Sequence, residues 1–109
     1  IKAEANAVAE NDGVAIEFEM LTADKPVALS EELAKKAEAI CEAEGIDYLH
    51  MNSGAGHDAM HMAKLAPTTM IFIPCKEGIS HNPAEFAKLE DICRAVEVLA
   101  KLLESEANE

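Results

Sequence analysis

The sequence predicts an α/β fold, because stretches with a helical spacing of apolar residues alternate with short extended apolar segments. Residues 31–44 and 86–103 repeat apolar side chains every three or four positions, as amphipathic helices do. Residues 68–74 are almost continuously apolar, which is expected of a strand buried on both faces. The remaining elements follow from local signals along the chain.

The first part of the chain predicts a helix, a strand and a hinge. Residues 1–10 are rich in Ala and run into Asn11-Asp12-Gly13, a typical helix stop. Residues 14–20 alternate apolar and polar side chains, the period of a strand with one exposed face. Residues 24–26 (Asp-Lys-Pro) break this alternation, so we expect a hinge between two structural units there.

The second unit is expected to begin with a capped helix. Ser30 fits the N-cap position, and Glu31 and Glu32 complement the helix dipole in the first turn. Gly45 fits the position at which such a helix ends. Residues 46–51 are then expected to form a short strand.

A glycine-flanked turn comes next and is a candidate binding loop. It consists of Ser53, Gly54, Ala55, Gly56, His57 and Asp58. Glycines let a ligand approach the backbone, and amide groups in front of a helix suit a carboxylate or a developing oxyanion. A plain turn leading into a helix over about 56–65, with Asp58 as a dipole partner, explains the same residues equally well.

A second candidate site follows the apolar strand, where His81 lies in the loop 78–85 (Gly-Ile-Ser-His-Asn-Pro-Ala-Glu). Neutral imidazole is a common zinc ligand, and loops at the ends of strands carry many sites in α/β folds. A histidine on an ordinary surface loop is the alternative. Asn82 and Pro83 fit the first positions of the last helix. Glu85 fits either a capping role there or one that orients His81.

Two histidines four positions apart raise a different hypothesis. His57 and His61 would share one helix face, as in zinc proteases with an H-E-x-x-H motif. Here Asp58 replaces the glutamate, which shortens the base by one methylene, and the predicted helix is short. A small zinc protease is therefore an alternative interpretation only.

Composition limits the partners and the compartment. The chain has 109 residues, half of them hydrophobic (50%), and a net charge of −12, which argues against binding to nucleic acids or anionic membranes. The three cysteines form no CxxC pair and fit reduced thiols in the cytoplasm. No apolar run approaches the ~20 residues of a membrane span. Because the chain begins at Ile1 without Met, we expect it to be part of something longer.

The two loops and the strand between them resemble a known enzyme family. Residues 53–59 (Ser-Gly-Ala-Gly-His-Asp-Ala), 70–74 (Met-Ile-Phe-Ile-Pro) and 78–85 are similar to the C-terminal part of the dinuclear metal-dependent amidohydrolases. N-carbamoyl-L-amino acid hydrolase, allantoate amidohydrolase and related ureidopropionases typify that family. The resemblance runs from Pro26 to Leu103 in order and spacing.

The resemblance implies a role for each motif. His81 matches the last ligand of a site for two divalent metal ions, most often zinc, with manganese, cobalt or nickel as alternatives. Residues 53–57 match the loop that lines the substrate pocket, and Asp58 and Glu85 match supporting acidic positions. The implied reaction is hydrolysis of a non-peptide C–N bond in a small linear amide or ureido acid, of the N-carbamoyl-L-amino acid or allantoate type.

The resemblance also implies a division of the chain. Residues 1–24 match the end of an inserted lid that forms a homodimer, and residues 25–109 match the C-terminal segment of the catalytic domain. The family's other metal ligands and its general-base glutamate lie upstream of these motifs. Because one histidine cannot hold a catalytic metal alone, we expect the isolated chain to be inactive and to bind metal weakly. A non-catalytic dimerisation module or degenerate relative is the alternative.

Overall fold

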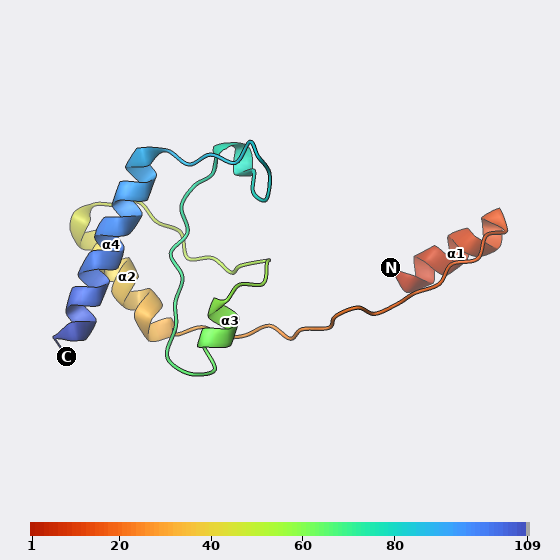
Figure 1. The fold of residues 1–109 in the computed structure, drawn as a ribbon, viewed down its shortest axis with the longest axis horizontal. Helices are drawn as coiled ribbons and strands as arrows, with labels where there is room; N and C mark the ends of the chain where they lie inside the picture. Colours follow the sequence, from red (N-terminus) through yellow and green to blue (C-terminus); the bar gives the residue numbers. More distant parts are fainter. Residues whose placement is uncertain (109) are drawn as a thin grey trace.

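The computed structural model describes residues 1–108 and is helical in its regular parts (Figure 1). Its elements are α1 (Lys2–Asp12), α2 (Glu31–Glu44), α3 (Ala59–Met62), the 3₁₀ turn η1 (Lys76–Gly78) and α4 (Leu89–Ala107). No helix within this described range is both long and apolar enough to span a bilayer.

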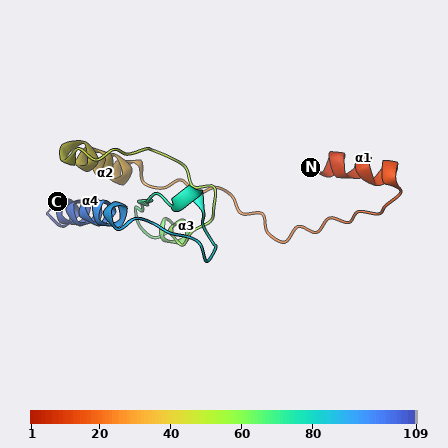
Figure 2. The same cartoon turned by 90° about the horizontal axis from the view of Figure 1, so that it is seen from above.

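Helices α2 and α4 lie side by side and form the packed part of the molecule (Figures 1 and 2). The buried side chains are Cys41 of α2 and Val98 and Leu102 of α4. Two ion pairs join the helices at the surface: Lys36 Nζ lies 2.7 Å from Glu106 Oε1, and Lys101 pairs with Glu44. Apolar burial therefore holds the pair together at its centre, and charge pairs add a smaller contribution outside it.

The prediction for α2 is confirmed at both ends. The Ser30 hydroxyl accepts a hydrogen bond from the Leu33 amide at 3.3 Å, which is the capping interaction expected of that residue. Gly45 takes the left-handed conformation (φ 66°) and its amide donates to carbonyls of the last turn. The Ser30 amide also donates to the Thr68 carbonyl at 2.8 Å, so the beginning of α2 is tied to the beginning of the apolar segment.

The N-terminal residues form an arm that lies away from the helical pair (Figures 1 and 2). Helix α1 ends at Gly13 (φ 67°), as predicted, and the chain then runs back so that the Lys2 ammonium lies 5.3 Å from the centre of the Phe18 ring. The radius of gyration is 19.9 Å, whereas a compact chain of this length would have about 13 Å. The arm is therefore an extension and not part of the core.

The three predicted strands are absent from the described residues 1–108. Residues 14–20, 46–51 and 68–74 are extended or irregular, but none pairs with a second strand. The physical reason is that a strand needs the backbone groups of a neighbour, and no other extended segment of the described chain lies in register beside these. The sheet of the predicted α/β layer thus stays a prediction.

Segment 46–51 instead makes side-chain contacts with α2. The Tyr48 hydroxyl donates to Glu42 Oε1 at 2.9 Å, and His50 Nδ1 lies 2.5 Å from Glu38 Oε1.

Segment 69–73 runs along α4 and leaves an apolar groove of about 270 Å³ between them, to which Ile71, Ile92, Val96 and Leu99 contribute. Many of the large apolar side chains around this groove are exposed.

The predicted beginning of the last helix is wrong. Helix α4 starts at Leu89 with Lys88 at the N-cap, not at the Asn82-Pro83 pair. Asn82 and Glu85 close a separate turn, in which the Glu85 amide donates to the Asn82 carbonyl at 2.9 Å. That turn satisfies the local backbone by itself, so the helix does not need to begin there.

Candidate functional site

The glycine-flanked turn is organised by the Ser53 hydroxyl. Ser53 Oγ donates to the Ala55 carbonyl at 2.9 Å and accepts from the Ala55 amide at 3.2 Å. His57 Nε2 lies 2.9 Å from the same oxygen, where a protonated Nε2 would donate to it. The hydroxyl therefore fixes both the local backbone and the imidazole ring.

Phe72 holds the other side of the His57 ring. The two rings meet edge to face, with centroids 5.7 Å apart and planes inclined by 65°. This contact joins the turn to the apolar segment 68–74. The contact itself was missed by sequence reasoning, because nothing local at Phe72 indicates which side chain it meets.

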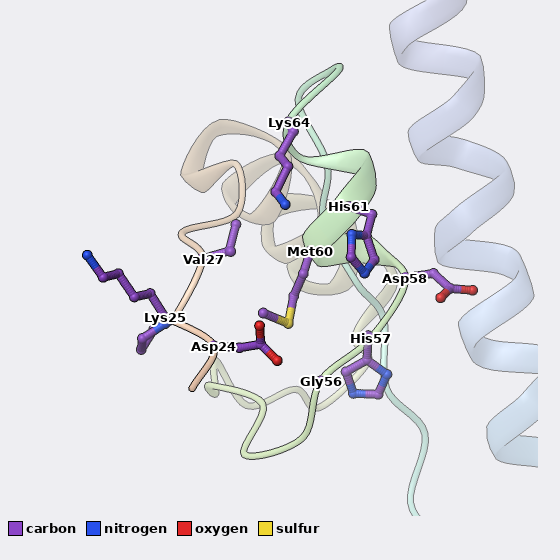
Figure 3. Close-up of a pocket in the computed structure, with 10 residues that line it drawn as sticks. Asp24, Lys25, Val27, Gly56, His57, Asp58, Met60, His61 and Lys64 are labelled. Carbon is purple, nitrogen blue, oxygen red and sulfur yellow. The ribbon is translucent and has the colours of Figure 1, made fainter. Parts of the chain in front are cut away.

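A cavity of about 490 Å³ lies beside this turn (Figure 3). It is lined by Asp24, Lys25, Pro26, Val27, Gly56, His57, Asp58, Met60, His61 and Lys64. The predicted hinge thus forms one wall and the predicted binding turn the other. Sequence reasoning missed this juxtaposition, because the two segments lie far apart along the chain and neither carries a motif that points to the other.

The structure brings part of the predicted binding set together at the cavity. Gly56 and His57 line it, whereas Ser53, Gly54 and Ala55 are not among its lining residues. In Figure 3 the carboxylate of Asp58 points away from Asp24 and the centre of the cavity. Asp58 is at the N-cap position of α3 but accepts no capping hydrogen bond there.

The zinc-protease arrangement of His57 and His61 is not formed. Helix α3 spans Ala59–Met62 only, in place of the predicted 56–65, and His57 precedes it. The reason is that the Ser53 hydroxyl and the Phe72 ring hold His57 in the turn. The two histidines therefore do not sit on one helix face as an H-E-x-x-H pair does.

His81 lies in a loop that is closed by main-chain hydrogen bonds. The Lys76 amide donates to the Phe86 carbonyl at 2.8 Å, which joins the two ends of the loop 76–86. His81 has a left-handed backbone (φ 54°), and its amide donates to Glu85 Oε2 at 2.9 Å. The Asn82 side chain accepts from the Ala84 amide at 2.9 Å.

The imidazole of His81 is exposed and outside the 490 Å³ cavity. Within residues 1–108 no group of three or more His, Cys, Asp or Glu side chains is placed to hold a metal ion. The described residues therefore do not form a complete metal centre by themselves.

The shifted pKa values belong to the surroundings of the helical pair. Burial, together with the charge of Glu38, raises the pKa of the Cys41 thiol. The hydrogen bond to Glu42 raises the pKa of Tyr48, and the ion pair with Glu44 raises that of Lys101. The raised pKa values further favour the protonated forms of all three side chains.

Comparison with known proteins gives one consistent answer. The sequence model of Peptidase family M20/M25/M40 matches residues 4–105. The chain is 43% identical over 98% of its length to an uncharacterized hydrolase of Haemophilus influenzae. It is 40% identical over 89% of its length to the allantoate amidohydrolase of Escherichia coli. It is 39% identical over 91% of its length to the N-carbamoyl-L-amino-acid amidohydrolase of Rhizobium meliloti.

The chain spans about a quarter of the length of these relatives, between 24% and 26%. The family model crosses the predicted boundary near residue 24, so the division into two units stays a prediction. Because the match covers nearly the whole sequence and includes both loops, this chain belongs to peptidase family M20/M25/M40, whose members share a metallo-hydrolase α/β fold.

Proposed function

We propose that this chain is the C-terminal part of a metal-dependent amidohydrolase that cleaves non-peptide C–N bonds in linear amides or ureido acids. One observation carries the proposal: named allantoate and N-carbamoyl-L-amino-acid amidohydrolases are 39–40% identical over at least 89% of the chain. The substrate class is accordingly a small N-carbamoyl-L-amino acid or an allantoate-type ureido acid.

In this proposal the two loops have different tasks. Residues 53–57 line the substrate pocket, with the His57 ring as its polar contact, held by Ser53 and Phe72. His81 supplies one ligand to a centre of two divalent ions, zinc in the first place. When bound, such ions would polarise the carbonyl and acidify a water molecule. The remaining ligands and the general base would come from sequence upstream of the chain.

The helical pair and the arm would belong to different parts of the enzyme. Residues 25–109 would be catalytic-domain sequence and residues 1–24 the end of a lid through which two subunits pair. The predicted hinge, residues 24–26, is consistent with this division, because it lines the cavity beside the binding turn. A lid that moves about this hinge would change the shape of that cavity.

The test compares the longer protein with the 109-residue chain. The longer protein should release ammonia or amino acid from a panel of N-carbamoyl-L-amino acids and allantoate, and should contain divalent metal by elemental analysis. The 109-residue chain should be inactive and bind zinc more weakly than micromolar in equilibrium dialysis. A longer protein that is inactive on the whole panel and free of metal would overturn the proposal, and so would submicromolar zinc binding by the chain alone.

A further inference from the structure

We propose that Glu85 is a positioning residue that acts on the main chain of His81 and leaves its imidazole free. This proposal rests on the role proposed above for His81 as a metal ligand. It adds how the loop holds the main chain of that residue. The carboxylate oxygen Oε2 of Glu85 accepts a hydrogen bond from the His81 amide at 2.9 Å. A carboxylate acceptor makes this bond stronger than one to a neutral group.

The bond acts where the backbone needs support. His81 has φ 54°, and a residue with a Cβ atom takes this left-handed conformation at a cost that glycine avoids. A conformation of this kind persists only where neighbouring interactions impose it. The hydrogen bond from the His81 amide to Glu85 is such an interaction, and it spans four positions across the turn.

The rest of the loop is arranged to favour the same turn. The Asn82 side chain accepts from the Ala84 amide, and the Glu85 amide donates to the Asn82 carbonyl, both at 2.9 Å. The Lys76–Phe86 backbone bond then closes the base of the loop at 2.8 Å. Glu85 is the side chain in this set that reaches the histidine itself.

The consequence concerns the direction of the ring. The left-handed backbone sets where the Cα–Cβ bond of His81 points, and hence which space the imidazole can reach. No hydrogen bond within residues 1–108 engages that ring, and it is exposed. Glu85 therefore fixes the base of the side chain and leaves both ring nitrogens available to a ligand supplied from outside the loop.

The test follows the backbone of position 81 by NMR in the 109-residue chain without metal. The native chain should show the strong intraresidue amide–Hα contact of a positive φ at His81 and slowed exchange of the Lys76 amide. Glu85→Ala should weaken that contact and speed exchange of the Lys76 amide by roughly threefold to tenfold, the change expected for losing one hydrogen bond. Glu85→Gln, which keeps a neutral acceptor oxygen, should fall between the native chain and Glu85→Ala.

A glycine background separates backbone positioning from general support of the loop. In His81→Gly the left-handed conformation has no Cβ cost, so adding Glu85→Ala should change Lys76 exchange by less than about twofold. The proposal is overturned if Glu85→Ala leaves position 81 at positive φ with native Lys76 exchange. It is equally overturned if Glu85→Gln behaves as Glu85→Ala. It is also overturned if adding Glu85→Ala to His81→Gly speeds Lys76 amide exchange as much as it does in the native chain.

The NMR test of Glu85 and the activity test of the proposed function can fail independently of each other. The NMR measurement needs no metal and no activity, so it can fail while the longer protein still hydrolyses ureido acids. Conversely, a longer protein with no hydrolase activity would remove the proposed function and leave the measured backbone effect of Glu85 unchanged.

Discussion

The two histidine loops of this molecule are held in opposite ways. In the glycine-flanked turn the side chain is fixed: the His57 ring is bonded to Ser53 and packed against Phe72. In the loop 76–86 the main chain is fixed, through the Lys76–Phe86 bond and the His81–Glu85 bond, and the His81 ring is left exposed. A ring held in place by neighbouring side chains suits a wall of a pocket, and a ring without a hydrogen bond suits a ligand for a centre completed elsewhere.

The largest expected effect tests the exposed ring. In the longer protein, His81→Ala should lower kcat by more than about 100-fold and reduce the bound metal, because groups that only support a ligand already cost 10–100-fold. Turnover and elemental analysis measure this. Native turnover with full metal content would contradict the role given to His81, and a matched His50→Ala variant, whose ring pairs with Glu38 of α2, serves as the control.

A smaller effect tests the fixed ring. Ser53→Ala removes the hydroxyl that bonds His57 Nε2 and the Ala55 backbone, so KM for a ureido substrate should rise about twofold to tenfold with kcat less affected. The ring-proton shifts of His57 should move in the 109-residue chain, since the ring can leave the Phe72 edge. Ser105→Ala on α4 removes a serine that bonds only its own helix and should change neither quantity. An unchanged KM together with unchanged His57 shifts would show that Ser53 does not hold the ring.

The smallest expected effect distinguishes the zinc-protease interpretation from the amidohydrolase interpretation. His61→Ala should lower activity only modestly, because the amidohydrolase proposal gives His61, which lines the cavity from α3, no role as a metal ligand. Substrate titrations of the native and variant proteins measure this. Complete loss of activity would contradict this expectation and support His61 as a metal ligand.

Local signals predicted the local parts of the structure well. Ser30 and Gly45 bound α2 as expected, because capping interactions depend on residues three or four positions apart. The same logic placed a stop at Gly13. It failed at Asn82, whose side chain accepts from the amide two positions on and closes an isolated turn, while the helix begins later, at Leu89.

Long-range features could not be predicted in the same way. Residues 68–74 have the composition of a buried strand, yet a strand exists only where another chain segment offers its backbone groups. The contact of Phe72 with His57 and the wall formed by Asp24–Val27 depend on tertiary packing, for which single residues carry no signal. The family resemblance, by contrast, was carried by whole motifs and is confirmed by the family match over residues 4–105.

The apolar groove beside α4 has a consequence for how the chain behaves in a cell. Val96 and Leu99 are 58% and 46% exposed along a helix that would bury them against a neighbouring layer. Chaperones and proteases recognise exposed apolar surfaces, and molecules that carry such surfaces associate through them. We therefore expect the chain to be prone to self-association until another protein layer covers this apolar surface.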